Sequence, residues 1–145
     1  MRAVVQRVTK GKVSASNKDL GEISHGLVIL LGIELGDSQE AADYLSKKIA
    51  NLRIFSDQNG KMNESILDQQ GEAIVVSQFT LMANTKKGNR PSFINAAPPE
   101  IAQPLVDTFI EQLHSYGIKV HSGEFGAHMM VEIHNDGPVT IIIDR

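Results

Sequence analysis

The sequence predicts an α+β fold in which two main helices pack on a mixed, barrel-like β-sheet, all within one domain over residues 1–145. Three observations predict it. Two continuous apolar runs are typical of strands buried on both faces, two stretches carry helical apolar stripes, and long connections between strands favour a mixed sheet. Hydrophobic residues make up 41% of the chain, and neither a linker nor an internal repeat divides it.

The first half of the chain predicts two strands and one helix. Residues 2–15 have a strand-like pattern, and the apolar run "GLVILLGIEL" at 26–35 ends at Gly36, as expected of a buried strand. Asp37 and Glu40 match a capping box and predict a helix over "DSQEAADYLSKKIANL". The expected buried stripe of this helix is Ala41, Leu45, Ile49 and Leu52.

The middle of the chain predicts a turn at 57–63, a second buried strand at 72–81 and a second helix. The segment between that strand and that helix, 82–99, is long and polar, a pattern that often marks function in a compact domain. Gly117 suits the position after the helix, and Pro104 either lies in its first turn or kinks it. The expected buried stripe is Ile101, Leu105, Phe109, Ile110 and Leu113.

Three strand-like runs, "IKVHSG", "AHMMVEIH" and "VTIIID", complete the sheet. Between the last two lies "NDGPVT" at 135–140, and Asn-Asp-Gly is typical of a tight hairpin turn. Pro138 stands where the returning strand should begin, although proline has no N–H to donate to a ladder. Two interpretations stay open: the strand starts one residue later, or the turn, with a cis Gly137–Pro138 bond, has a use beyond turning.

The composition excludes several kinds of site. There is no cysteine, so a disulfide, a thiolate zinc site and a cysteine nucleophile are impossible. The five histidines form no tight metal-binding pair, and no glycine-rich phosphate loop is present, so we expect no metal and no cofactor. The opening "MRAVVQRVTK" does not resemble a signal peptide and no apolar run is long enough for a membrane span, which predicts a cytoplasmic protein. The net charge of −3 argues against broad nucleic-acid binding, but not against a local basic patch.

Two neighbouring segments contain the candidates for chemistry. In "SQFTL", the Ser77 and Thr80 hydroxyls lack a nearby base and a G-x-S-x-G turn, so we expect them to satisfy backbone groups at a strand end. Free backbone N–H groups at that end could instead serve as an oxyanion hole. In "KKGNRPSF", the cations Lys86, Lys87 and Arg90 are either solvated surface or a phosphate-binding group.

The segments "SQFTL" and "NDGPVT", together with "MRAVVQRV" and "GLVILLGI", resemble the D-aminoacyl-tRNA deacylase family over essentially the whole chain. The resemblance implies the barrel-like fold of that family and a homodimer whose active sites lie at the subunit interface. It also implies hydrolysis, without a cofactor, of the ester that joins a D-amino acid or glycine to the 3′-terminal adenosine of tRNA.

The resemblance further implies roles for individual residues. Gly137 and Pro138, joined by a cis bond, are expected to enter the partner's active site and to reject L-aminoacyl groups. Backbone N–H groups near Phe79 and Thr80 are expected to form the oxyanion hole, while Gln78 positions the terminal adenosine. The remaining expected contacts are with the substrate, by Ser77, Met129 and Arg7, and with tRNA, by Lys86, Lys87 and Arg90.

The role of Thr80 stays open between nucleophile and structural wall, and the absence of a base favours the wall. Two rival functions also follow from these segments. One is an amidase or esterase that uses Thr80 covalently and does not act on tRNA. The other is a non-catalytic dimeric module that binds RNA or a small ligand through "KKGNR".

Overall fold

A computed structural model describes residues 1–145 and contains a six-stranded mixed sheet, two long helices and a small hairpin. The sheet strands are β1 (Arg2–Ala15), β2 (Lys18–Ile23), β3 (Gly26–Gly32), β6 (Glu72–Ser77), β7 (Lys119–Ser122) and β8 (Met129–Asp144). The helices are α1 (Gln39–Ala50) and α2 (Pro99–Ser115), and a short 3₁₀ helix, η1, covers Phe79–Met82. The hairpin pairs β4 (Phe55–Ser56) with β5 (Met62–Glu64), around the predicted turn. The α+β class is confirmed.

The sheet has the order β2-β1-β3-β6-β7, and β8 also pairs with β1. The β3–β6 and β6–β7 pairs are parallel and the other pairs are antiparallel, so the sheet is mixed. The sheet curls until β2 approaches β7, and Gly21 of β2 lies against His121 of β7. A Cβ at Gly21 would come within 2.5 Å of His121 Cβ, so glycine allows this near closure of the barrel.

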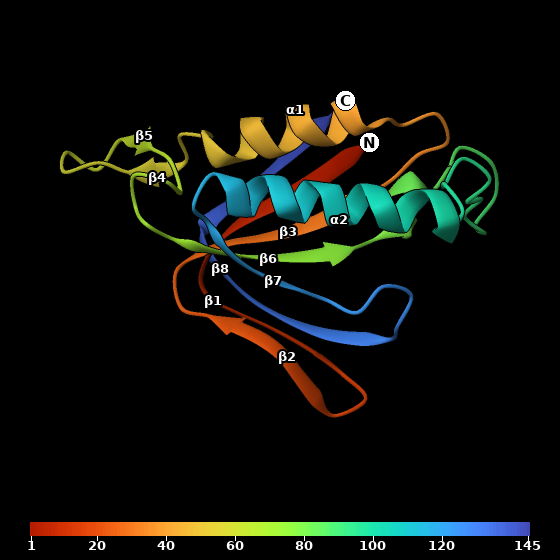
Figure 1. The fold of residues 1–145 in the computed structure, drawn as a ribbon, viewed down its shortest axis with the longest axis horizontal. Coiled ribbons are helices and arrows are strands. Elements are labelled where there is room, and N and C mark those ends of the chain that lie inside the picture. Colours follow the sequence, from red (N-terminus) through yellow and green to blue (C-terminus); the bar gives the residue numbers. More distant parts are fainter.

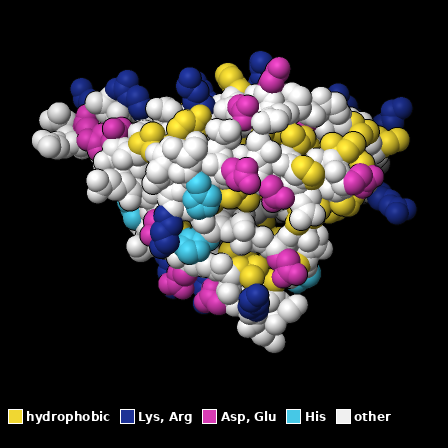
Figure 2. Space-filling view, viewed as in Figure 1, with side chains coloured by type: hydrophobic (Ala, Val, Ile, Leu, Met, Phe, Trp, Pro, Cys, Tyr) yellow, Lys and Arg dark blue, Asp and Glu magenta, His cyan; other side chains and the backbone are white.

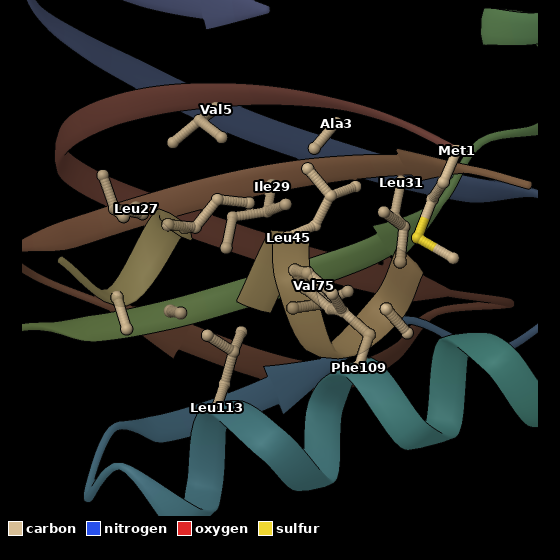
Figure 3. Close-up of a cluster of buried hydrophobic side chains, with 14 of the residues drawn as sticks. Met1, Ala3, Val5, Leu27, Ile29, Leu31, Leu45, Val75, Phe109 and Leu113 are labelled. Carbon is tan, nitrogen blue, oxygen red and sulfur yellow. The ribbon is translucent and has the colours of Figure 1, made fainter. Parts of the chain in front are cut away.

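Both helices cover the same face of the sheet, on the side of β3 and β6 (Figure 1). Figure 3 shows Leu45 from α1 and Phe109 and Leu113 from α2 pointing toward side chains of β3 such as Ile29. These residues are fully buried, and burial of one such side chain stabilises the fold by about 1.5–3 kcal/mol. A second, smaller cluster fills the curled part of the sheet and contains Val8, Val13, Ile23, Val28, Ile74 and Val76.

The capping box predicted for α1 is wrong. Ser38 is the N-cap residue, and no side chain caps the helix. Asp37 instead accepts hydrogen bonds from the Met1 ammonium and from the Glu34 N–H, both at 2.6 Å. A charged ammonium is a stronger partner for a carboxylate than a neutral helix amide, which explains the change. The predicted stripe is otherwise buried, although Leu52 lies beyond the helix end.

The apolar stripe of α2 differs in part from the prediction. Ile101 is 44% exposed, whereas the buried positions follow the i, i+4, i+7, i+11 spacing. Pro104 lies in the second turn and not the first, and the helix continues past it to Ser115. Gly117 has φ +87° immediately after the C-cap, so its predicted role is confirmed. The buried positions are Ala102, Val106, Phe109 and Leu113.

The two apolar strands end earlier than predicted. β3 ends at Gly32 and β6 at Ser77, and η1 begins at Phe79, immediately after Gln78. The early ends follow from close packing, because a Cβ at Gly32 would lie 3.0 Å from the Gln78 carbonyl oxygen and 2.8 Å from the Met82 side chain. The chain therefore turns at Gln78 directly over β3, and this turn forms one edge of the pocket described below.

The hairpin predicted at "NDGPVT" is also wrong, because β8 is one continuous strand that pairs with β1 on both sides of this segment. Gln6 pairs with Thr140 and Val8 with Asn135, so β8 has more residues than β1 between these pairs and bulges outward. Gly137 has φ +119°, and the Gly137–Pro138 bond is cis. A bulge needs a residue that tolerates positive φ just as a hairpin does, which explains the misleading signal. No helix in the chain is long and apolar enough to cross a membrane.

Candidate functional site

A largely apolar pocket of about 520 Å³ lies where the parallel strands β3 and β6 end. Its walls come from these strand ends, from η1, from the first turns of α2 and from the segment that leads into β8. Apolar walls with a few polar groups are typical of a site for a small ligand. Among its lining residues are Ser77, Gln78, Phe79, Ala102, Phe125 and Met129.

The backbone at the pocket edge is held by two hydrogen bonds. The Gln78 N–H donates to the Leu31 carbonyl at 2.8 Å, which joins the end of β6 to β3. The Leu81 N–H then donates to the Gln78 carbonyl at 3.1 Å and begins η1. The N–H groups of Phe79 and Thr80 precede that first donor, so they have no partner within the helix. The amide of Phe79, which lines the pocket, and the adjacent amide of Thr80 are therefore unpaired within η1.

The hydroxyl groups near this edge have no catalytic base. Thr80 is exposed, and its Oγ1 accepts a hydrogen bond from the side-chain amide of Gln78. Neither Ser77 nor Thr80 hydrogen-bonds to a histidine or a carboxylate. Ser77 lines the pocket, but Thr80 does not. Thr80 therefore lies outside the pocket, next to the lining residue Phe79.

The Gly137–Pro138 bulge lies against Arg7, a buried residue of β1. Arg7 Nε is 2.9 Å from Asp136 Oδ2, and Nη1 donates to the Ile54 carbonyl at 2.6 Å. The Nε–H does not point at the carboxylate oxygen, so this contact is an ion pair and not an aligned hydrogen bond. Arg7 therefore connects the bulge to the segment that precedes β4.

Two further features shape the bulge. The Asn135 side-chain amide donates to the Arg7 carbonyl at 3.1 Å and to the Val139 carbonyl at 2.8 Å, which ties the two ends of the bulge together. A Cβ at Gly137 would lie 2.8 Å from Val139 Cγ2 and 3.1 Å from Arg7 Nη2. Both the space and the positive φ thus favour glycine at this position.

Within one chain, the bulge and the pocket lie at opposite ends of β3. Arg7 pairs with Leu27 near the start of β3, whereas Ser77 pairs with Leu31 near its end. Four residues along a strand correspond to about 13 Å. The structure therefore brings Ser77, Gln78, Phe79 and Met129 together, but it leaves the bulge and Arg7 at the other end of the sheet.

Residues 84–93, called the basic loop from here on, form an exposed loop beside the pocket. Two backbone hydrogen bonds between Asn84 and Ser92, of 2.8 and 3.0 Å, close its base. Lys86, Lys87 and Arg90 are exposed, and none of them forms an ion pair. Figure 2 shows basic and hydrophobic side chains together at the right-hand end of the molecule, where Figure 1 places the connection from β6 to α2.

The residues with clearly shifted pKa values lie away from the pocket. A hydrogen bond from Lys12 lowers the pKa of Asp19, and a hydrogen bond from Arg2 lowers the pKa of Asp144. None of these four residues lines the pocket. No group of three or more His, Cys, Asp or Glu side chains is placed to hold a metal ion.

Sequence reasoning missed several residues at the pocket. Ala102 and His128 line it, and Phe93 contacts the lining residue Phe79 from the basic loop. Ala102 was missed because the expected buried stripe of α2 began at Ile101, one residue earlier. His128 was missed because its sequence pattern is that of a polar residue in an alternating strand. Segments far apart in sequence form the pocket, and no local pattern signals their meeting.

These features define an α+β domain with a ligand-sized pocket at the carboxyl ends of parallel strands. Residues 4–144 match the family model described as D-Tyr-tRNA(Tyr) deacylase, and the chain belongs to that family. It is 57% identical to the D-aminoacyl-tRNA deacylase of Roseiflexus sp. (strain RS-1), over 99% of this chain and 93% of that protein. It is 52% identical to the D-aminoacyl-tRNA deacylase of Thermosipho africanus (strain TCF52B), over 99% and 97% of the two chains.

Two solved structures share the fold. The "c-Myc DNA Unwinding Element Binding Protein" superposes with a TM-score of 0.93 at 43% identity, over 100% of this chain and 99% of that one. A "probable eukaryotic D-amino acid tRNA deacylase" superposes with a TM-score of 0.86 at 16% identity, over 99% and 98%. The predicted barrel-like fold with two packed helices is thereby confirmed.

Proposed function

We propose that this protein hydrolyses the ester bond of D-aminoacyl-tRNA and releases the free D-amino acid and the tRNA. Family membership over residues 4–144 carries the proposal, and relatives more than half identical to the chain are named for this activity. The pocket supports it, because about 520 Å³ of mostly apolar space suits a terminal adenosine with its aminoacyl group. The proposed reaction needs no metal or cofactor.

The amides of Phe79 and Thr80 form the oxyanion hole of the proposed reaction. Phe79 lines the pocket and Thr80 follows it, and neither amide has a partner in η1, so both can donate to the ester oxygen as it becomes negative. Gln78 lines the same pocket and positions the terminal adenosine. Ser77 and Met129 complete the wall around the substrate.

Water is the proposed nucleophile. The Thr80 hydroxyl has no base beside it, and its hydrogen bond from Gln78 fixes it as a structural group. The backbone at the pocket edge and the ribose 2′-OH of the substrate position the attacking water. The covalent amidase or esterase alternative requires an activated Thr80, and the geometry around this hydroxyl does not favour it.

Selectivity in this proposal comes from a second subunit. Within one chain the Gly137–Pro138 bulge is about 13 Å along the sheet from the pocket. A two-fold dimer presents both surfaces twice, so each bulge can enter the partner's pocket. Carbonyl oxygens of the bulge then hold the substrate α-ammonium by charge-assisted hydrogen bonds.

With the ammonium and the ester held, the two remaining positions at Cα are distinguishable. A D side chain points to solvent, so its size has little effect on binding. An L side chain strikes the bulge, which Arg7 and Asp136 hold in place. Rejection by steric contact gives specificity without a side-chain pocket, and glycine, which has no side chain, is accepted.

The basic loop supplies affinity for tRNA in this proposal. Lys86, Lys87 and Arg90 have no carboxylate partner, so their charges are available to phosphates. The cytoplasmic location stays a prediction, and it fits a substrate made during translation.

A second candidate is nucleic-acid binding without catalysis, because one similar solved protein is named for binding a DNA element. The net charge of −3 weakens this candidate. One experiment separates the two: the purified protein is incubated with D-aminoacyl-tRNA, L-aminoacyl-tRNA and glycyl-tRNA, and released amino acid is measured against a protein-free control. Hydrolysis of the D and glycyl esters, with the L ester intact, is the expected result. Binding of all three tRNAs without hydrolysis would support the second candidate instead.

A further inference from the structure

We propose that Phe93, with its neighbour Ile94, forms a stacking platform for the unpaired nucleotides that precede the terminal adenosine of tRNA. The inference rests on the proposed function, and it adds a binding site for the RNA strand outside the catalytic pocket. The platform is built from the end of the basic loop, immediately after the Asn84–Ser92 closure.

The exposure of these side chains calls for an explanation. Phe93 is 37% exposed, Ile94 is 78% exposed, and the adjoining Phe79 is 58% exposed. Other phenylalanines of the chain, Phe55 and Phe109, are buried in the core. Large apolar side chains that gather on a surface mark an interaction site more often than isolated ones do.

The geometry places this platform beside the pocket. The Phe93 ring packs edge-to-face on Phe79, with 5.1 Å between centroids and 69° between planes. Phe79 itself lines the pocket. When the terminal adenosine of tRNA occupies the pocket, the preceding nucleotides must leave the pocket over its edge. The Phe93 ring is held by Phe79 at one such edge.

The charge of the neighbouring loop identifies the partner as RNA. Lys86, Lys87 and Arg90 lie on the same closed loop, exposed and without ion-pair partners. A positively charged track beside exposed aromatic rings is the usual arrangement for single-stranded nucleic acid, in which bases stack and phosphates contact cations.

The test compares two substrates that differ only in the nucleotides before the adenosine. One is D-aminoacyl-tRNA and the other is D-aminoacyl-adenosine. Phe93→Ala should lower kcat/KM for the tRNA substrate by about 5- to 150-fold, mainly through KM, because stacking on an aromatic side chain is worth that much per base. Hydrolysis of D-aminoacyl-adenosine should be unchanged, since this substrate does not reach the platform.

Three further variants make the result specific. Phe93→Tyr keeps the ring and should retain activity on tRNA, whereas Phe93→Leu keeps the apolar contact with Phe79 but should lose activity as Phe93→Ala does. Tyr44→Leu removes a half-exposed aromatic ring from α1 and should change neither substrate. Sedimentation of each variant reports the oligomeric state.

Several outcomes would overturn the platform. If Phe93→Ala lowers kcat/KM equally for both substrates, Phe93 only supports the pocket. If kcat/KM for the tRNA substrate does not fall, the Phe93 ring does not bind RNA. Dissociation of the oligomer by Phe93→Ala would assign the patch to a contact between copies. If the unmodified protein hydrolyses neither substrate, the proposed function fails, and uncharged tRNA then tests the platform by itself. In that case Phe93→Ala must weaken binding of CCA-ended tRNA and leave binding of tRNA without these nucleotides unchanged.

Discussion

The two ends of β3 carry different kinds of structure. At its carboxyl end, a mostly apolar pocket is bordered by η1, whose first backbone amides have no helical partner. At its amino end, a bulge of β8 is held by the buried guanidinium of Arg7 and by Asp136. The first end is suited to stabilising charge on a substrate, and the second to presenting a fixed surface. In the proposed function, catalysis and selectivity therefore lie on separate elements, and a second chain is needed to bring them together.

The largest expected effect tests the pocket end. Phe79→Pro removes one amide donor at the first position of η1, where proline is tolerated because this N–H has no helical partner. We expect kcat for D-aminoacyl-tRNA to fall by about 10²–10³-fold, the usual cost of losing an oxyanion-hole donor. Phe79→Ala keeps the amide and serves as the control. Similar kcat values for the two variants would mean that the Phe79 amide does not stabilise the transition state.

The next effect tests the bulge end. Gly137→Ala places a Cβ near Val139 and Arg7 at φ +119°, which adds about 1–3 kcal/mol of backbone strain. If the bulge moves to relieve that strain, D-aminoacyl-tRNA hydrolysis should fall by about 5- to 150-fold while the circular-dichroism spectrum is unchanged. Gly60→Ala, at an exposed glycine of positive φ in the β4–β5 turn with open space around it, is a matched control for backbone strain alone. Normal discrimination and normal rates in Gly137→Ala would show that the bulge does not read the substrate.

A smaller effect is expected from the basic loop, because in the proposed function it contacts the RNA and not the reacting ester. Replacing Lys86, Lys87 and Arg90 with alanine should raise KM and leave kcat unchanged. The salt dependence should also flatten, by about 0.7 in the slope of log affinity against log salt for each lost phosphate contact to a single strand. Binding titrations over a range of salt concentrations give this slope. An unchanged slope would mean that the three cations are solvated surface residues that do not contact phosphates.

The smallest effect is expected at Thr80. Thr80→Ala keeps the backbone amide and removes a hydroxyl that has no base, so most of the activity should remain. Steady-state hydrolysis and mass spectrometry of the quenched reaction check this. A loss on the order of 10⁴-fold, together with a trapped acyl-enzyme, would make Thr80 the nucleophile and replace the water mechanism.

Local pattern predicted the elements whose formation depends on their own side chains. The long first strand, the two apolar strands and both helices follow from periodicity, and Gly117 from its conformational freedom. The errors occurred where a distant partner decided the structure. Asp37 binds the N-terminal ammonium and does not cap α1. "NDGPVT" forms a bulge because β1 is long enough to pair with β8 on both sides of it.

The site was predictable only in pieces, for the same reason. "SQFTL" and the Gly137–Pro138 segment were recognisable as unusual from their residues alone. Their separation by about 13 Å along β3 depends on strand register, which no local pattern contains. The contact of Phe93 with Phe79 likewise depends on how the basic loop closes through Asn84 and Ser92.

The most direct test of the central claim, that each active site needs both chains, mixes two inactive proteins. Chains carrying Phe79→Pro are unfolded and refolded together with an equal amount of chains carrying Gly137→Val, and D-aminoacyl-tRNA hydrolysis is measured. Random pairing gives hybrid dimers in which one of the two sites combines an intact pocket with an intact bulge, so activity should return to about one quarter of that of the unmodified protein. Hybrid dimers that form, as shown by native mass spectrometry, and that remain inactive would contradict the account.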